Sequence, residues 1–384
     1  MPPLAGVRVI EFCQVAAGPF CGLLLADMGA DVVKVEPPDG DGLRQWPPFT
    51  DGDSENFASL NRNKRSVMLD LKDAGQRETA RRLALSADVV LENFRPGVMA
   101  RLGLGYDNLS RDKPSLVYCS VSAFGQSGPR SREGGFDLTV QAMSGVMSVT
   151  GEADGPPVKC GVPISDFGAG LYAAFAIVSA LHKARRDGTG DCIDVSMLGA
   201  TLGMAALQTS EYFGTGRDPV KLGSAHPRNA PYQAFKAADG YFAMAAGNDR
   251  LWQAACASIA RGDLAEDARF RTTSLRAKNQ VALRSILEQE FGRRSVDELL
   301  KLFADAGVPC APINTYSQVL QDPQVQHMQW VQPLQLPGGS ETVTFVSPLK
   351  MRGERFGVHR RPPALGEHTR EILAELGAEA ESQE

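Results

Sequence analysis

Short apolar runs alternate with longer segments of mixed polarity over the first two hundred residues. Apolar runs of strand length occur at residues 7–12, 31–36, 66–71, 87–93, 115–121 and 192–196. Between these runs, apolar residues recur at the spacing of a helix at residues 17–28, at 74–86 and from Pro96 onward. Strands that alternate with helices predict an α/β fold with a largely parallel sheet.

The pattern changes further along the chain. Residues 171–184 are apolar nearly all round, which predicts a buried helix. Residues 214–219 contain glycine and proline and predict a linker. Two apolar runs then flank residues 238–240, which predicts a hairpin, and two helical segments follow near residues 275–305. We therefore expect an α+β second domain.

This pattern divides the chain into two domains. A large domain is predicted over residues 1–214, completed by the C-terminal segment 325–384, and a small domain over residues 225–324. A chain of 384 residues exceeds the usual size of one compact domain, which agrees with this division.

Composition narrows the function classes. The net charge of −5 gives no basic excess of the kind that nucleic acid or an anionic membrane attracts. We find no apolar run long enough to span a membrane, and the seven cysteines form no Cys-x-x-Cys pair. Five scattered histidines show no metal-ligand spacing. We expect a soluble cytoplasmic protein without a metal.

Asp166 is the most informative single residue. It lies among small and apolar residues, in the run from Val162 to Gly170, which leaves the carboxylate open to close approach. An aspartate before a long helix is most often an N-cap. The alternative is a nucleophile that attacks an activated acyl group. Asp137, after two glycines and Phe136, has the same two interpretations.

Several other groups lie where ligands bind in open parallel sheets. The first strand-to-helix turn, residues 14–20, lacks G-x-G-x-x-G, so a nicotinamide cofactor is not favoured. Asn93 and Phe94 follow a predicted strand. The basic cluster Asn61–Arg65 is either a solvated loop or a phosphate site. A lone histidine in a loop, such as His226, is more often a surface residue than a catalytic one.

Together these segments resemble family III CoA-transferases, the group of formyl-CoA transferase and crotonobetainyl-CoA:carnitine CoA-transferase. The resemblance covers almost the whole chain. Its marks are residues 4–12 with 17–19, 29–36, 61–66, 92–97, 154–157, Asp166, 232–235, 247–249 and 365–368.

The resemblance implies a Rossmann-like large domain and two chains interlocked as an obligate homodimer. It implies that Asp166 forms an acyl anhydride and then an aspartyl-CoA thioester. Coenzyme A, as a substrate rather than a permanent cofactor, would contact residues placed in the large domain by the likeness, namely Gln14, Val15, Ala17, Asn93, Phe94 and Arg101.

Two departures from formyl-CoA transferase concern the first strand-helix-strand unit. Gln14 and Pro37 stand where that enzyme has a histidine and an arginine. The missing positive charge would then come from Arg44, Arg62 or Lys72.

The likeness is closest to enzymes that move CoA from succinyl-CoA to a second dicarboxylate such as glutarate. An acyl pocket is expected at Phe136, Asp137, His226 and Arg228, with His226 or Arg228 binding the free carboxylate.

Two other functions fit the same fold. An α-methylacyl-CoA racemase needs a histidine where this chain has Phe136, and a phenyl ring accepts no proton, so the transferase is favoured. A non-catalytic CoA-binding scaffold would have no use for a carboxylate at position 166.

Overall fold

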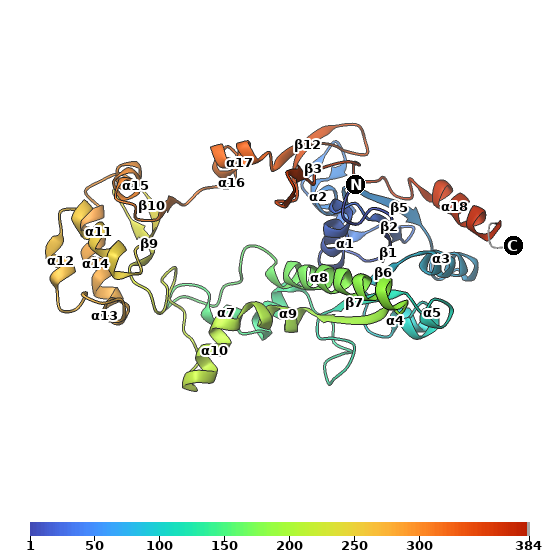
Figure 1. Cartoon of the computed structure of the whole chain (residues 1–384), viewed down its shortest axis with the longest axis horizontal. Helices are drawn as coiled ribbons and strands as arrows, with labels where there is room; N and C mark the ends of the chain where they lie inside the picture. The colour runs from blue at the N-terminus through green and yellow to red at the C-terminus, as the bar shows by residue number, and fades with distance from the viewer. Residues whose placement is uncertain (382–384) are drawn as a thin grey trace. The chain divides into compact units, whose positions relative to one another are not determined.

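A six-stranded parallel sheet lies at the centre of the first of two units in the computed structural model, which describes residues 1–381 (Figure 1). Its strands are β1 (Arg8–Phe12), β2 (Asp31–Glu36), β5 (Lys64–Met68), β6 (Val89–Glu92), β7 (Val117–Ser122) and β8 (Asp191–Ser196). The strand order is β5-β2-β1-β6-β7-β8. In chain order this is 3-2-1-4-5-6, the Rossmann arrangement, and the predicted α/β class with a parallel sheet is confirmed.

Valine and isoleucine fill the strands because both faces of this sheet are covered. Val9 pairs with Val32 on one side of β1 and with Val89 on the other, and all three are fully buried. β-Branched side chains of this kind favour extended backbone and pack well on a pleated surface. The local pattern was therefore sufficient to locate β1, β2 and β6.

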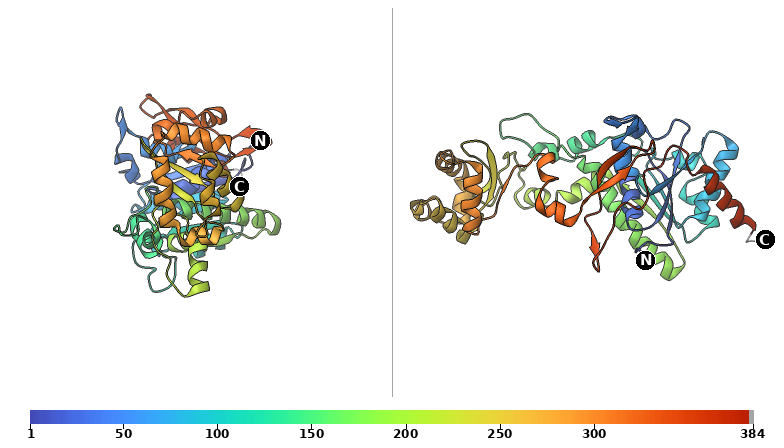
Figure 2. Two further views of the ribbon diagram at one scale, coloured as in Figure 1. Left: turned by 90° about the vertical axis from the view of Figure 1, so that its left-hand side faces the viewer. Right: turned by 90° about the horizontal axis from the view of Figure 1, so that it is seen from above.

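Helices cover both faces of the sheet (Figures 1 and 2). One face packs against α1 (Ala17–Asp27), α6 (Asp137–Met143), α8 (Ile164–Asp187) and α9 (Met197–Met204). The other packs against α3 (Ala74–Ser86), α4 (Val98–Arg101), α5 (Tyr106–Asp112) and α18 (Thr369–Glu381). The C-terminal segment thus joins the first unit, through α18 beside α3.

The helices α1 and α8 approach each other very closely. A Cβ atom at Gly170 would lie 2.8 Å from the backbone oxygen of Ala17, so only glycine fits there. This contact fixes the first turn of α1 against the second turn of α8. Ala17 and the preceding turn of α8, which holds Asp166, belong to the site described below.

The long helix α8 is apolar and has 24 residues, enough to cross a membrane by length and composition alone, which differs from the expectation that no run of that length is present. One of its faces, which includes Ala173 and Ile177, is buried against the sheet. Its other face exposes Leu171 and Phe175.

Shorter elements complete the first unit. They are η1 (Gly42–Gln45), β3 (Phe49–Thr50), β4 (Asp53–Ser54), α2 (Glu55–Asn61), α10 (Ala206–Thr215), α17 (Pro323–Met328), β12 (Val331–Gln335), β13 (Glu341–Phe345), β14 (Lys350–Met351) and β15 (Glu354–Arg355).

The second unit is built on a three-stranded antiparallel sheet, β11-β10-β9, with helices around it. Its strands are β9 (Tyr232–Lys236), β10 (Tyr241–Ala245) and β11 (Cys310–Pro312). Its helices are α11 (Asp249–Ser258), α12 (Gly262–Glu266), α13 (Thr273–Lys278), α14 (Gln280–Phe291), α15 (Val296–Asp305) and α16 (Tyr316–Val319). The expected hairpin is present, with Lys236 opposite Tyr241.

The extent of the second unit differs from the predicted small domain. Besides Asp218–Asp322 it includes Met147–Val158, which was predicted to belong to the large domain, while α7 (Val146–Val149) lies at the transition. The reason is a set of hydrogen bonds distant in sequence: Gly223 N–H donates to the Gly151 carbonyl over 2.9 Å, and Lys221 donates to the Gly155 carbonyl.

The basic cluster Asn61–Arg65 is neither a solvated loop nor a phosphate site. Its cations are buried and form ion pairs with acids distant in the sequence. The pairs are Arg62–Asp27 at 2.7 Å, Lys64–Glu11 at 2.8 Å and Arg65–Glu375 at 2.7 Å. Because these charges are neutralised inside the unit, β5 begins at Lys64, two residues before the predicted strand.

Candidate active site

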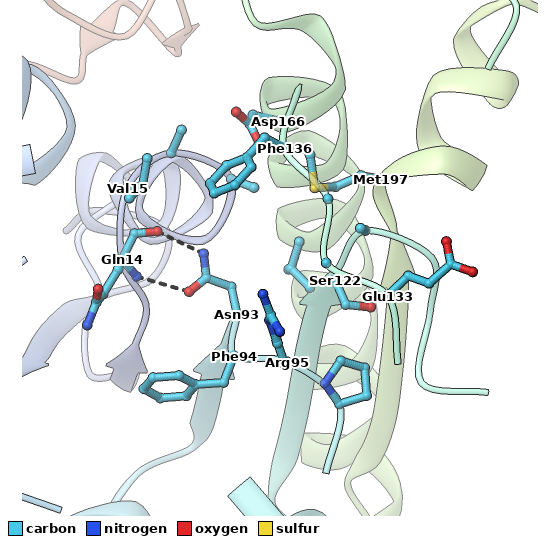
Figure 3. A pocket seen from close by; sticks show the side chains of 17 residues that line it. Gln14, Val15, Asn93, Phe94, Arg95, Ser122, Glu133, Phe136, Asp166 and Met197 are labelled. Atoms are coloured by element: carbon cyan, nitrogen blue, oxygen red, sulfur yellow. Dashed lines mark hydrogen bonds between the residues drawn. The ribbon is translucent and has the colours of Figure 1, made fainter. Parts of the chain in front are cut away.

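A cavity of about 390 Å³ opens at the carboxyl ends of β1, β6 and β7, where the strand order of the sheet reverses (Figure 3). Ligands bind in this crevice in open α/β sheets. Its lining residues are Gln14, Val15, Ala16, Ala17, Asn93, Phe94, Arg95, Pro96, Val121, Ser122, Ala123, Glu133, Gly134, Gly135, Phe136, Asp166 and Met197.

Asp166 lies in the first turn of α8, and its side chain lines this cavity. The N-cap position belongs to Pro163, so the N-cap interpretation of Asp166 is wrong. The described residues give its carboxylate no hydrogen bond and no ion pair. Burial, with a further contribution from the charge of Asp137, raises the pKa of Asp166 to about 7. An unshielded carboxylate of this kind is available to attack an electrophile.

Asp137 does not line the cavity and supports α8 instead. Its Oδ1 accepts the backbone N–H of Ser165 over 2.9 Å, and its Oδ2 accepts the amide of Gln141 over 2.7 Å. It therefore satisfies one of the free N–H groups in the first turn of α8, next to Asp166. The capping interpretation holds for Asp137, but the capped helix is α8, which is distant in sequence. Neighbouring Phe136 is 78% exposed and does line the cavity.

The turn after β1 is held by the side chain of Asn93. Its Oδ1 accepts the N–H of Gln14 over 2.9 Å, and its Nδ2 donates to the Gln14 carbonyl over 2.8 Å (Figure 3). Both backbone groups of Gln14 are thus paired with one side chain from the end of β6. The two predicted ligand-binding segments are joined directly.

Val15 follows in the left-handed backbone region, with φ of 67°, which is unfavourable for a β-branched residue. Its N–H donates to Oδ1 of Asp41 over 3.1 Å. Asp41 is fully buried and lies 2.8 Å from Nζ of Lys34, which also donates to the Cys13 carbonyl over 2.7 Å. Although burial raises the pKa of the Asp41 carboxyl, Lys34 and the backbone donors outweigh burial and lower it. We call Asp41, Lys34 and Asn93 the turn clamp.

A second cavity of about 210 Å³ shares Gln14 and Phe94 with the first. Its other lining residues are Phe12, Cys13, Val35, Glu36, Pro37, Leu69, Asp70, Leu71, Lys72 and Leu102. The two cavities are therefore neighbours that share two lining side chains.

The three cations expected to supply the missing positive charge differ in their partners. Arg44 pairs with Glu36 at 2.7 Å, and Arg62 pairs with Asp27, so both are committed to the protein's own acids. Lys72 lines the second cavity. Arg101, another predicted contact, lines neither cavity. Of the three replacements, Lys72 is the one positioned to meet a ligand there.

His226 and Arg228 belong to the second unit. Nδ1 of His226 accepts the backbone N–H groups of Arg228 and Asn229, at 3.1 and 3.0 Å. Burial and the charge of Arg228 lower the pKa of His226. The histidine thus stabilises its own loop.

Two charged lining residues, Arg95 and Glu133, were not among the predicted site residues. The signal for Arg95 was its position directly after Asn93 and Phe94 in the segment 92–97. Among residues 1–381, no group of three or more His, Cys, Asp or Glu side chains that could hold a metal ion is present.

Known proteins match the chain along nearly its whole length. It is 41% identical over 383 residues to "Succinate--glutarate CoA-transferase" of Agrobacterium fabrum, covering 98% of this chain and 96% of the relative. It is 38% identical over 387 residues to "Succinyl-CoA:mesaconate CoA-transferase" of Haloarcula hispanica, covering 98% and 97%.

A solved structure has the same fold. The crystal structure of a CAIB/BAIF family protein from Brucella suis superposes with a TM-score of 0.87 at 39% identity, covering 98% of this chain and 99% of that one. The sequence profile described as "CoA-transferase family III" matches residues 4–369, which include the cavity, both predicted ligand-binding segments and Asp166. With the Rossmann arrangement and near-full-length relatives in agreement, this chain belongs to CoA-transferase family III.

Proposed function

We propose that this enzyme moves CoA from succinyl-CoA to a second dicarboxylate, with Asp166 as the nucleophile. The observation that carries the proposal is the position of Asp166: a carboxylate with no hydrogen-bond partner among the described residues, lining the cavity at the sheet edge. The substrate class is supported by the names of the relatives, which act on succinate or succinyl-CoA with glutarate or mesaconate.

In the first half of the reaction, an Asp166 carboxylate oxygen attacks the thioester carbon of succinyl-CoA. The carbon–sulfur bond breaks, CoA leaves as the thiolate, and a mixed anhydride remains. The thiolate then attacks the Asp166 carbonyl carbon of the anhydride. Succinate leaves as the carboxylate, and Asp166 becomes a CoA thioester.

The second half runs the same steps in reverse with the acceptor. Its carboxylate attacks the aspartyl thioester and expels the CoA thiolate, which then attacks the acceptor's acyl carbon. A new acyl-CoA and free Asp166 result, and no proton is gained or lost. Both anhydrides are sensitive to water, so the site must hold the acyl group while limiting access of solvent.

CoA would extend from the first cavity, where the thioester meets Asp166, into the second. Gln14 and Phe94 line both cavities and would contact the middle of the CoA molecule. Lys72 would contribute a positive charge at the far end. Val15, Ala17 and Asn93 would contact the part near the thioester, and Arg101 is proposed as an outer contact.

The homodimer is part of the same proposal. The exposed face of α8 carries Leu171, Phe175 and Val178, at the spacing that places them along one side of a helix. A contiguous apolar surface of this kind favours burial against another chain. Phe136, which lines the first cavity, is proposed to contact the acyl group.

Intact-protein mass spectrometry after mixing with succinyl-CoA tests the nucleophile. We expect a covalent adduct that hydroxylamine or borohydride traps at Asp166 and that Asp166→Ala abolishes. Asp137→Asn is the matched control, because it alters the nearest carboxylate and should keep the adduct. A wild-type enzyme that forms no adduct while exchanging an α-proton of an acyl-CoA would instead support a racemase; neither signal would support a scaffold.

A further inference from the structure

Arg95 is the one cationic side chain among the described residues that line the Asp166 cavity. It follows β6 directly, and in Figure 3 its guanidinium lies between Asn93 and Ser122, within the ring of lining residues. The other charged lining residues are the acids Glu133 and Asp166. A cation here must serve either the protein or a ligand.

The protein makes no use of this charge within residues 1–381. The guanidinium of Arg95 has no ion pair and no hydrogen bond there. Glu133, which lines the same cavity, pairs instead with Arg130 at 2.8 Å. The five N–H donors of Arg95 therefore remain available, whereas Arg44 and Arg62 are neutralised by acids of the protein.

The neighbouring backbone leaves room for this side chain. A Cβ atom at Gly134 would lie 3.0 Å from Nη2 and 3.4 Å from Cζ of Arg95. A side chain at 134 would require the guanidinium to move by a few tenths of an ångström. The absence of a side chain at 134 thus has a steric explanation that involves Arg95.

We propose that Arg95 binds the distal carboxylate of the dicarboxylyl group and selects dicarboxylyl-CoA over monocarboxylyl-CoA. The planar fork of a guanidinium matches a carboxylate with two parallel hydrogen bonds. In a succinyl group the distal carboxylate carbon is only three bonds, roughly 4 Å, from the carbon that Asp166 attacks. Both ends therefore fit within one cavity of about 390 Å³.

The CoA phosphates are anions as well, but a long pantetheine arm separates them from the thioester. If the thioester reaches Asp166, the phosphates lie outside this cavity. The carboxylate is therefore the favoured partner. This inference rests on the proposed function, since it requires an acyl thioester at Asp166.

The test compares kcat/KM for succinyl-CoA and for butyryl-CoA, which has the same CoA and chain length but ends in a methyl group. For Arg95→Gln we expect a loss of at least about 10-fold with succinyl-CoA and less than about 3-fold with butyryl-CoA. Arg95→Lys, which keeps the charge but loses the fork, should fall between. Gly134→Ala should lower the same selectivity.

Arg111→Gln removes an arginine from α5, away from the cavity, and serves as the matched control. We expect it to change neither value. Equal losses with both donors in Arg95→Gln would assign Arg95 to CoA and overturn the inference, and so would no loss with either. A wild-type enzyme that transfers CoA from no dicarboxylyl-CoA would refute the proposed function itself. Circular dichroism melting of each variant identifies loss of fold, in which case Arg95→Lys decides.

Discussion

A carboxylate that attacks a thioester has to be ionised, and the surroundings of Asp166 oppose ionisation. Burial and the neighbouring charge of Asp137 raise its pKa to about 7. A high pKa also makes the anion a stronger nucleophile once it forms. The raised pKa therefore lowers the fraction of Asp166 that is ionised and increases the reactivity of the ionised form.

The pH dependence of kcat/KM for succinyl-CoA should report this balance. Since the anion is the reactive form, we expect kcat/KM to fall as the pH drops below about 7. Asp137→Asn removes a like charge and lowers the pKa of Asp166. The acidic limb of the profile, where kcat/KM falls with decreasing pH, should therefore move to lower pH by up to about one unit. Initial rates between pH 5 and 9 measure both profiles.

Glu92 complicates this assignment, because burial and the charge of Asp194 raise the pKa of Glu92 to about 7 as well. Asp137 is not among the charges that act on Glu92. A limb that stays in place in Asp137→Asn would therefore belong to another group and contradict the assignment to Asp166.

Single residues also show what sequence reasoning can reach. The position of Asp166 in the cavity could be anticipated because a carboxylate among glycines is conspicuous and the family pattern matches it. The sequence did not show that Arg44 and Arg62 are neutralised whereas Arg95 is not. The acids that neutralise them, Glu36 and Asp27, come close to these arginines only in the folded protein. Charge is visible in a sequence, but pairing between distant residues is not.

At the scale of elements, the turn between β1 and α1 is the most constrained part of the site. A β-branched residue at positive φ costs about 1–3 kcal/mol and persists only where its surroundings enforce it. The N–H of Val15 points to Asp41, whose carboxylate is fixed by Lys34. The turn clamp thus holds a strained segment in the shape that lines the cavity.

A double-mutant cycle tests this role of Asp41. We expect Asp41→Asn to lower kcat/KM for succinyl-CoA about 10-fold, since the neutral amide holds the Val15 N–H less strongly. Glycine adopts positive φ without strain, so the same substitution should cost at least about threefold less in the Val15→Gly background.

Equal costs in both backgrounds would show that Asp41 acts elsewhere, for example through the N–H of Leu43, which it also accepts. Thermal melting of all four proteins separates loss of stability from loss of the turn's shape.

Most elements of the first unit were predictable because their signals are local. The helix predicted at 74–86 is present at Ala74–Ser86, and the strand predicted at 31–36 at Asp31–Glu36. The clamp was not predictable, since it joins residues 13–15, 34, 41 and 93. The strand near residue 66 was misplaced because buried lysine and arginine look like loop residues until their partners are known.

At the scale of the whole molecule, the exposed side of α8 predicts association. Leu171 and Phe175 are 53% and 74% exposed in the isolated chain. Replacing them with Glu should leave the melting temperature of the isolated chain nearly unchanged and abolish the dimer, because the cost of a buried charge arises only on association. Sedimentation velocity measures the mass of each form.

Leu373→Glu is the matched control, since Leu373 is 39% exposed on α18, on the opposite face of the sheet. It should leave the mass unchanged. A wild-type protein that sediments as a monomer, or a Leu171→Glu, Phe175→Glu variant that remains dimeric, would contradict the proposal. The interlocking of two chains is an expectation from the family resemblance alone, because hydrophobic periodicity carries no information on threading.

The helix α8 begins at Ile164 with the first turn that holds Asp166 and continues two turns later with the exposed Leu171 and Phe175. The proposed nucleophile and the exposed apolar stripe are therefore parts of one helix. In the proposed dimer, a second chain that covers this stripe would hold the helix that carries Asp166, so that association and the placement of the carboxylate would be coupled through α8.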